Sequence, residues 1–227
     1  MSKTVYFLRH GQTEGNARSV HQYPETMLSD KGREQVRLAG EHFKDIPLDL
    51  IIASPFERTR ETASAVLAHK EGVPIEYSAL FEELRRPREI WGKGWFSPKP
   101  LWIMAMLYMN ARKENWHYSD EENLEEFHAR ARRALEYLAD RPEERILVVT
   151  HRGLMANLIE RIKHDGMDTI AQYRRALWKN LTIGNCCYLT ATWTPEGENG
   201  STLDGTWTVQ NDTTCPAGGG RTDYRLG

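Results

Sequence analysis

The sequence predicts an α/β fold, a three-layer sandwich in which helices flank a mostly parallel central sheet. Short apolar runs typical of buried strands alternate with segments of helical periodicity, a pattern characteristic of a parallel sheet that is covered on both faces. The 227 residues, 40% of them hydrophobic, suffice for one substantial core, and no Pro/Gly/Ser-rich linker occurs before about residue 194. We therefore expect a single domain over residues 1–227, with a helical insert at about 84–120 and a loose tail at about 215–227.

Each expected element follows from a local pattern. Apolar runs predict strands at residues 4–8, 50–53, 75–77, 146–150, 185–193 and 206–210. The clearest helix follows Ser29 as its cap, because Val36, Ala39, Gly40 and Phe43 recur at positions i, i+3, i+4 and i+7 and so share one buried stripe. Further helices are expected after the first strand and at about 55–70, 121–138 and 154–162.

The first strand runs into Arg9-His10-Gly11, the most informative junction in the chain. It places an imidazole capable of nucleophilic attack beside a fixed positive charge, and the glycine lets the backbone turn away from the sheet. Such a pair suits attack on phosphorus. Because a tripeptide of this kind recurs by chance, the interpretation depends on support from elsewhere in the chain.

Two other strands end in a similar way. After the second strand, Ser54 as a helix cap and Glu57 three residues later predict a capping box. Arg58 then lies in the first helical turn, where free amides and the helix dipole already favour anions. The strand at 146–150 is followed directly by His151, a second histidine at the carboxyl end of a strand.

These junctions are expected to meet. In open α/β sheets ligands bind outside the carboxyl ends of the strands, so Arg9, His10, Arg58 and His151 should converge at one edge. Each residue taken singly is as compatible with an ordinary surface group. Together, from three distant segments, they predict a site for a phosphoryl group.

With these residues in place, the chain resembles the histidine phosphatase superfamily, the phosphoglycerate mutase-like enzymes. The motifs stand in family order over about the first two thirds of the chain. The matching segments are Leu8-Arg9-His10-Gly11-Gln12-Thr13 with Asn16, Leu28-Ser29-Asp30-Lys31-Gly32-Arg33-Glu34-Gln35, Ser54-Pro55 with Arg58-Thr59, Glu82-Glu83 and Thr150-His151-Arg152-Gly153. The combination is specific, although no single piece is.

The resemblance implies a mechanism through a phosphohistidine. Neutral His10 attacks phosphorus, while Arg9, Arg58 and a cationic His151 offset charge on the phosphoryl oxygens. Because these groups supply positive charge, we expect neither a metal nor another cofactor. The family's general acid corresponds to Glu83, whose neighbours Phe81-Glu82-Glu83-Leu84 reproduce the family pattern. An alignment that makes Glu82 the acid stays open.

Other residues are assigned to substrate binding. Asn16, Gln22 and the backbone amide of Gly153 are expected to add hydrogen bonds to the phosphoryl oxygens. Arg85 and Arg86, with Arg88 beside them, are candidates for recognising further negative charge on a substrate. The competing interpretation is that these arginines form an ordinary solvated face.

We therefore predict a metal-independent histidine acid phosphatase-type phosphomonoesterase that acts on a small phosphorylated metabolite. The chain lacks, after Asn16 and around Glu83, the landmarks that resemblance to glycolytic mutases would demand. The first alternative is a phosphoglycerate mutase, and a phosphoryl-transfer isomerase of this kind would use the same histidine. A second, less favoured alternative is a non-catalytic module that binds a phosphorylated ligand.

Composition bounds the partners and the compartment. A formal charge of -2 argues against nucleic acid and acidic membranes as partners. The apolar run at the N-terminus is too short for a signal-peptide core, so we expect a cytoplasmic enzyme. Three cysteines match no disulfide framework or zinc spacing and are expected to be reduced. The apolar run at 101–109 needs cover on several faces, and a homodimer is a candidate for providing it. The resemblance implies that the insert at about 84–120 forms a helical cap beside the catalytic edge.

Overall fold

The computed structural model of the chain describes residues 1–111, 113, 115–164, 183–195, 205–210 and 213–217. These residues form one mixed six-stranded sheet in the order β3-β2-β4-β1-β5-β6. Neighbours among β3, β2, β4 and β1 are parallel, whereas β5 and β6 are antiparallel additions at one edge. The expected mostly parallel sheet is confirmed. The strands are β1 (Lys3–Arg9), β2 (Leu50–Ala53), β3 (Ile75–Tyr77), β4 (Arg145–Thr150), β5 (Tyr188–Pro195) and β6 (Gly205–Val209).

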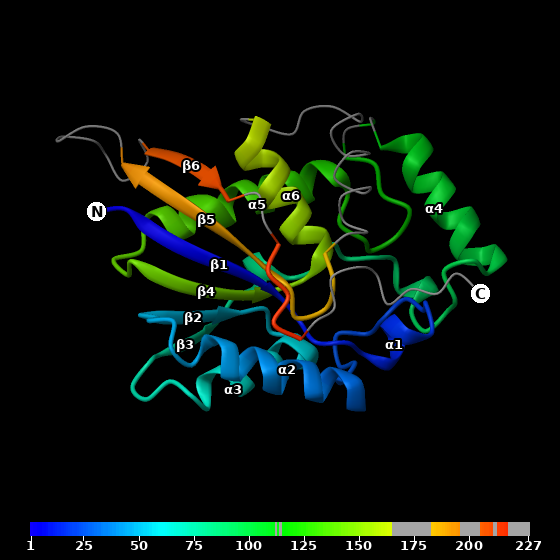
Figure 1. The fold of residues 1–227 in the computed structure, drawn as a ribbon. Helices are drawn as coiled ribbons and strands as arrows, with labels where there is room; N and C mark the ends of the chain where they lie inside the picture. The colour runs from blue at the N-terminus through cyan, green and yellow to red at the C-terminus, as the bar shows by residue number, and fades with distance from the viewer. Residues whose placement is uncertain (112, 114, 165–182, 196–204, 211–212, 218–227) are drawn as a thin grey trace.

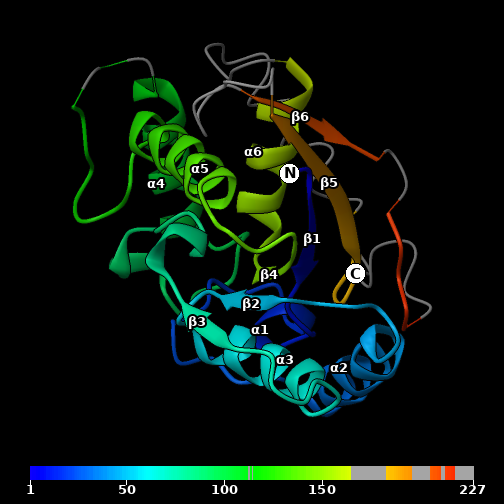
Figure 2. The ribbon, with the colours of Figure 1, turned by 90° about the vertical axis from the view of Figure 1, so that its left-hand side faces the viewer.

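Helices cover both faces of this sheet, as Figures 1 and 2 show. On one face lie α2 (Asp30–Phe43) and α3 (Glu57–Leu67), and on the other α5 (Leu124–Ala139) and α6 (Arg152–His164). Side chains alternate along each strand, so Val148 of β4 joins the core beneath α5 and α6 while Val149 joins the opposite core. The predicted three-layer sandwich is confirmed.

The helix starts show which local signals held. Ser29 caps α2, accepting a hydrogen bond of 3.1 Å from the Gly32 amide, and the predicted stripe of α2 is buried. The capping box predicted at Ser54 is wrong, because α3 begins at Glu57 after Phe56 and has no side-chain cap. Ser54 is fully buried and turned toward the sheet edge, where its hydroxyl has another partner.

Some boundaries differ from the predicted ones by a few residues. Helix α6 begins at Arg152, α5 begins after its cap Asn123, and β5 begins at Tyr188. The strand expected from residue 185 starts late because Asn185 and Cys186 form a turn, with Cys186 at a φ of 54°. That turn closes against the end of β1, so it belongs to the site described below.

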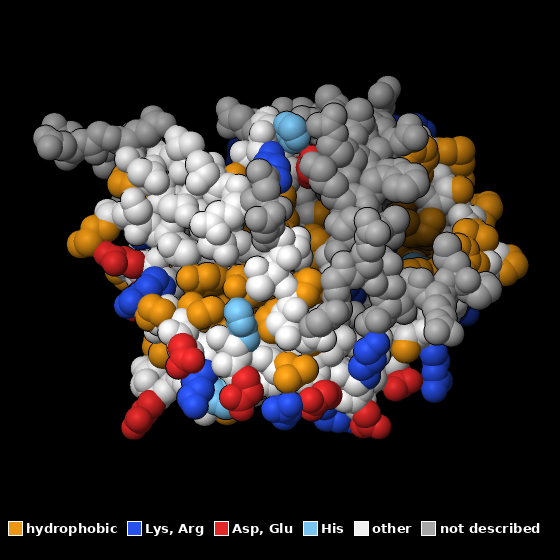
Figure 3. Space-filling model, viewed as in Figure 1, with side chains coloured by type: hydrophobic (Ala, Val, Ile, Leu, Met, Phe, Trp, Pro, Cys, Tyr) orange, Lys and Arg blue, Asp and Glu red, His pale blue; other side chains and the backbone are white. Residues whose placement is uncertain are grey.

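The cap insert contains the short 3-10 segment η2 (Arg88–Ile90) and α4 (Pro98–Asn110), with α1 (Glu14–Ala17) nearby at the same end of the molecule. A second 3-10 segment, η1 (Ala79–Phe81), lies just before the insert. Hydrophobic side chains gather over α4 in Figure 3, where Leu101, Trp102, Tyr108 and Met109 are each at least half exposed. The apolar run is thus covered on one side only, and a homodimer across this face stays a prediction.

The cysteines depart from expectation. Cys187 and Cys215 form a disulfide, and Cys186 is free and buried. The prediction of three reduced thiols is wrong because a backbone bridge between Tyr188 and Thr214 returns the chain to β5 and brings the two cysteines together. Residues 218–227 of the predicted tail lie outside the described residues.

A helix that crosses a lipid bilayer has to be both long and apolar. In the described ranges, no helix combines the length and the apolar character that a membrane crossing requires.

Candidate active site

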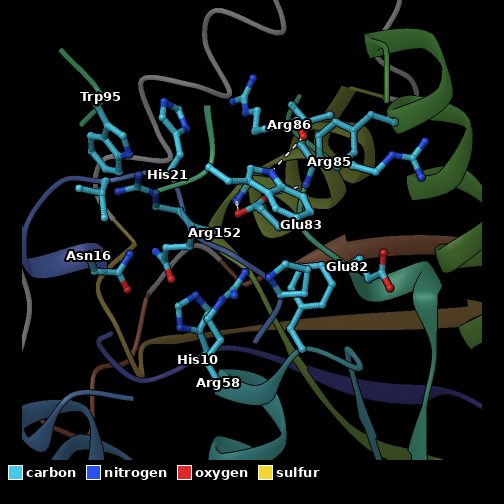
Figure 4. A pocket seen from close by; sticks show the side chains of 18 of the residues that line it. His10, Asn16, His21, Arg58, Glu82, Glu83, Arg85, Arg86, Trp95 and Arg152 are labelled. Atoms are coloured by element: carbon cyan, nitrogen blue, oxygen red, sulfur yellow. Dashed lines mark hydrogen bonds between the residues drawn. The ribbon is translucent and has the colours of Figure 1, made fainter. Parts of the chain in front are cut away.

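A cavity of about 630 Å³ opens where β1, β2 and β4 end (Figure 4). The carboxyl ends of parallel strands meet at one edge, which explains why segments far apart in the sequence contribute to it. Nine of the ten predicted site residues line it: Arg9, His10, Asn16, Gln22, Arg58, Glu83, Arg85, Arg86 and Gly153. The tenth, His151, is fully buried next to His10, with 5.2 Å between the ring centroids.

His10 stands directly after β1 and is only 4% exposed. Its ring Nδ1 lies 2.7 Å from the Gly11 carbonyl oxygen, which can only accept, so Nδ1 carries the proton and Nε2 keeps a lone pair. Burial, together with the charges of Arg58 and Arg9, holds the pKa of His10 well below its usual 6.5. The ring is therefore neutral at neutral pH, the form in which Nε2 is a nucleophile.

Two buried arginines flank this ring. Arg9 donates from Nη1 to the Ile183 carbonyl at 2.7 Å, and Arg58, in the first turn of α3, donates from Nη1 to the Tyr23 carbonyl at 3.0 Å. Burial lowers the pKa of Arg58 to about 10, which leaves it charged at neutral pH. Its Nε is buried without a hydrogen-bond partner in the part of the chain that the structure describes. A ligand with anionic oxygens would suit this pair of guanidinium groups.

His151 is held in one neutral form. Its Nδ1 lies 3.3 Å from Arg58 Nη2, which can only donate, so Nε2 carries the proton and donates to Ser54 Oγ at 2.9 Å. Burial, followed by the charge of Arg58, holds the pKa of His151 well below 6.5. The expectation of a cationic His151 is therefore wrong, and the fixed positive charge of the site comes from arginines.

Glu83 is anchored to the start of α6. Its Oε2 accepts a hydrogen bond of 3.0 Å from the Gly153 amide, and its Oε1 accepts one of 3.0 Å from the Leu84 amide. The Gly153 amide, predicted to bind phosphoryl oxygens, is thus occupied by Glu83 in this structure. A Cβ atom at Gly153 would lie 2.1 Å from Glu83 Oε1, so only glycine leaves room for the carboxylate here.

The segment that carries Glu82 and Glu83 is braced from behind by Arg130 of α5. Nη1 of Arg130 donates to the Leu80 carbonyl at 3.0 Å and to the Glu82 carbonyl at 2.8 Å, while Nη2 pairs with Glu122 at 2.7 Å. Burial raises the pKa of Glu82, against the opposing charge of Arg130. Both carboxylates line the cavity, but the Glu83 carboxylate is the one bound to the segment that follows His151.

Asn16 and Gln22 present amides to the same cavity. Asn16 Oδ1 accepts from the Thr13 amide and from Asn185 Nδ2, each at 3.3 Å, so its own NH₂ group is left to donate elsewhere. Gln22 Oε1 accepts from the Thr13 hydroxyl at 2.8 Å, which fixes the amide of Gln22 beside α1. Asn185 Nδ2 also donates to the His10 carbonyl at 3.0 Å. The turn before β5 thereby fixes both His10 and Asn16.

The cap arginines are not equivalent. Arg85 is exposed and donates from Nε to the Asp120 carbonyl at 2.9 Å, and Arg88 pairs with the Asp120 carboxylate at 2.7 Å. Arg86 is half-buried, and Nη1 lies 3.6 Å from the Met104 sulfur, a weak acceptor. The two residues predicted together as a charge-recognising pair both line the cavity but differ in their contacts, because Arg85 is held by Asp120 whereas half-buried Arg86 has the Met104 sulfur as its contact.

Sequence reasoning missed several contributors, above all Ser54 as partner of His151, Arg130 and Asn185. The sequence did contain an indication for Arg130, because this charged residue interrupts the apolar stripe of α5 formed by Phe127, Ala131 and Ala134. Asn185 had none, because a polar residue before a strand is ordinary. In the described residues no group of three or more His, Cys, Asp or Glu side chains is arranged to hold a metal ion.

The site thus brings two histidines and two arginines together at the carboxyl ends of parallel strands, and comparison with known sequences shows the family of the chain. The profile of the histidine phosphatase superfamily (branch 1) matches residues 5–203. The chain belongs to this superfamily. A protein of Erwinia tasmaniensis named probable phosphoglycerate mutase GpmB is 27% identical over 201 residues, covering 85% of this chain and 88% of that protein. A probable phosphatase of Schizosaccharomyces pombe is 38% identical over 80 residues, covering 35% of this chain and 38% of the relative.

Solved structures show the same fold. The α-ribazole phosphatase from Shigella flexneri superposes with a TM-score of 0.69 at 20% identity, covering 92% of this chain and 96% of that one. A mycobacterial glucosyl-3-phosphoglycerate phosphatase superposes with a TM-score of 0.68 at 22% identity, covering 92% and 97%. At these identities the likeness supports the fold, while the activity of this chain has to be argued from its own site.

Proposed function

We propose that the protein is a phosphomonoester hydrolase that works through a phosphohistidine on His10 and acts on a small phosphorylated metabolite. The observation that carries the proposal is the state of His10: it is neutral, its Nδ1 is tied to Gly11, and its Nε2 has no hydrogen-bond partner among the residues that the structure describes. Arg9 and Arg58 flank it, and the Glu83 carboxylate lines the same cavity (Figure 4). This set supports nucleophilic phosphoryl transfer.

The first step forms a bond between His10 Nε2 and phosphorus as the ester bond to the leaving oxygen breaks. Arg9 and Arg58 stabilise the charge that spreads over the phosphoryl oxygens, and the NH₂ groups of Asn16 and Gln22 donate to the same oxygens. Protonated Glu83 gives its proton to the leaving oxygen, which departs as an alcohol.

The second step returns the enzyme to its starting state. Water attacks phosphorus, the bond to His10 breaks, and the Glu83 carboxylate takes the proton that the water loses. Inorganic phosphate is released, and Glu83 is again protonated. Glu83 gives a proton in the first step and takes one in the second. Its anchoring by the Gly153 amide holds it in place for both transfers.

Within this proposal the arginines provide the charge stabilisation, so we expect no metal requirement. Full activity should persist after exhaustive treatment with EDTA. Activity that disappeared and returned on addition of Mg²⁺ or Zn²⁺ would contradict this expectation.

A phosphoglycerate mutase is the second candidate, because relatives that match 85% of this chain carry that name. The first half-reaction is the same for both activities. They differ in the acceptor, which is water for a phosphatase and a second hydroxyl group for a mutase. In the proposed mechanism Asn16, Gln22 and Glu83 would play the same part with either acceptor.

One experiment separates the two activities. We expect the enzyme to release inorganic phosphate from several monoesters without a bisphosphoglycerate primer, and faster than it converts 3-phosphoglycerate to 2-phosphoglycerate. Mutase flux that exceeded hydrolysis and depended on the primer would reverse the assignment. The phosphohistidine on His10 would stand in that case.

A further inference from the structure

The cavity is larger than a phosphoryl group needs. Its far wall contains the guanidinium group of Arg86. In Figure 4, Arg86 and His21 lie on the side of the cavity away from His10 and Arg58. Among the described residues, the hydrogen-bond contact of the Arg86 guanidinium is the Met104 sulfur at 3.6 Å, and no carboxylate lies within ion-pair distance of it. A half-buried guanidinium of this kind is a binding group for an anion.

Three acidic side chains near this wall are engaged elsewhere. Asp120 is bound by Arg88, and Glu122 pairs with Arg130. Glu121 is buried, and its two carboxylate oxygens accept hydrogen bonds from the amides of Tyr118 and Ser119. Each of these three carboxylates could pair with Arg86 only by giving up its present contact.

Arg86 also separates the main cavity from a second one. A cavity of about 250 Å³ behind α4 shares Leu84, Arg86 and Met104 with the main cavity. The side chain of Arg86 thus has open space on both sides, so a ligand group can approach the guanidinium without displacing packed core residues.

His21 adds a second polar group at the same wall. Its Nε2 is buried and has no hydrogen-bond partner within the described ranges, and its ring lies beside Trp95 with 6.5 Å between centroids. Burial and the charge of Arg86 lower the pKa of His21 to about 4, so at neutral pH the ring is uncharged. The backbone amide of His21 donates to the Lys93 carbonyl at 2.9 Å, which fixes the ring against the cap.

We propose that Arg86 and His21 form a subsite for a second anionic group on the leaving-group side of the substrate. This inference rests on the proposed function, since it takes His10 as the place of the reacting phosphoryl group. The substrate class is a phosphate monoester whose alcohol part bears a carboxylate or a second phosphate. Arg86 provides the charge, and neutral His21 provides a hydrogen bond without adding a second desolvated cation.

The test compares two series of alkyl phosphate monoesters with chains of two to six carbons. In one series the far end bears a carboxylate, and in the other it bears a neutral hydroxyl group. We expect kcat/KM to be about tenfold to a hundredfold higher for the carboxylate at the chain length that spans the cavity, mainly through a lower KM. Comparing kcat/KM for a sugar bisphosphate with that for the corresponding monophosphate repeats the test with phosphate as the second anion.

Variants assign the preference to the subsite. Arg86→Gln should abolish it, and His21→Phe should reduce it by a smaller factor because the charge remains. Arg132→Gln removes the same charge from an exposed position on α5 and should keep the preference. The subsite would be overturned if kcat/KM were equal for both series at every chain length. It would also be overturned if the preference for the carboxylate series survived Arg86→Gln.

A binding measurement keeps this result apart from the proposed function. In His10→Ala protein, calorimetry with the same pairs of compounds should show tighter binding of the carboxylate series, and Arg86→Gln in that background should remove the difference. If no phosphohistidine forms but this discrimination is found, the chemistry fails and the subsite stands. If phosphohistidine forms and the discrimination is absent, the subsite fails.

Discussion

The Gly153 amide and the Glu83 carboxylate are joined by a hydrogen bond of 3.0 Å that links two segments 70 residues apart. Gly153 is the second residue of α6, directly after the end of β4 where His151 lies. The candidate acid and His151 are therefore held at the same strand end, the carboxyl end of β4. This contact makes a glycine, which has no reactive group, a determinant of the proposed chemistry.

Gly153→Ala should reduce activity without unfolding the protein. The added Cβ would lie 2.1 Å from Glu83 Oε1, so the carboxylate must move, whereas alanine favours a helix by about 1 kcal/mol over glycine. We expect a fall in kcat of about a hundredfold for alkyl phosphates, on the order of the loss of general acid help. Steady-state kinetics and a thermal melt measure the two effects.

Gly94→Ala is the matched control for that variant. A Cβ there would meet nothing closer than Ser97 Oγ at 3.4 Å, which is ordinary contact. Its kinetics should stay near those of the wild type. If Gly153→Ala behaved like Gly94→Ala, the proposed anchoring of the acid would be wrong.

The two neighbouring glutamates should respond differently to amide substitution. Glu83→Gln removes the proton donor and should slow alkyl phosphates by about 10²- to 10⁴-fold, but p-nitrophenyl phosphate much less, since its leaving group hardly needs a proton. Glu82→Gln should change little. The ratio of kcat/KM for the two substrates is the measurement, and an exchange of behaviour between the variants would move the acid to Glu82.

Acid should destabilise the protein through its buried histidines. His10 and His151 have pKa values well below 6.5, so the unfolded chain binds protons that the folded chain does not. As far as these rings determine it, the unfolding free energy has its full value above about pH 6.5. It falls as the pH drops toward the pKa values of the folded state, by up to about 1.4 kcal/mol per pH unit for each ring. Urea unfolding at about pH 7 and pH 5 measures this loss.

Two variants check the origin of that pH dependence. His151→Asn should shrink the difference in unfolding free energy between the two pH values. His117→Asn should change it in the opposite direction, because the hydrogen bond to Glu126 raises the pKa of His117. A wild-type protein that was equally stable at both pH values would show that the two buried rings are protonated in the folded state.

How much the sequence predicts depends on the distance over which a feature is determined. Local patterns predict that strands end at Arg9 and just before His151, and that Arg58 lies on a helix. The rule that ligands bind at the carboxyl ends of parallel strands then predicts that these residues meet. The role of Ser54 did not follow, because its hydroxyl is claimed by a ring 97 residues away rather than by its own helix. The neutral state of His151 did not follow either, since it depends on burial beside Arg58.

The cap shows the same limit. The run Arg85, Arg86 and Arg88 reads as one basic patch in the sequence, and all three line the cavity. Asp120 nevertheless holds the first and third, whereas the contact of Arg86 is the Met104 sulfur. Nothing local to the run distinguishes its members. The distinction arises from a loop more than 30 residues later in the chain.

The most direct test of the account is rapid-quench labelling with a ³²P-labelled phosphate monoester. The account predicts that wild-type protein traps phosphate in an acid-labile, base-stable bond, that peptide mapping places it on His10, and that His10→Ala protein traps none while still binding inorganic phosphate through Arg9 and Arg58. Label that persisted in the His10→Ala protein, or that mapped to another residue, would contradict it.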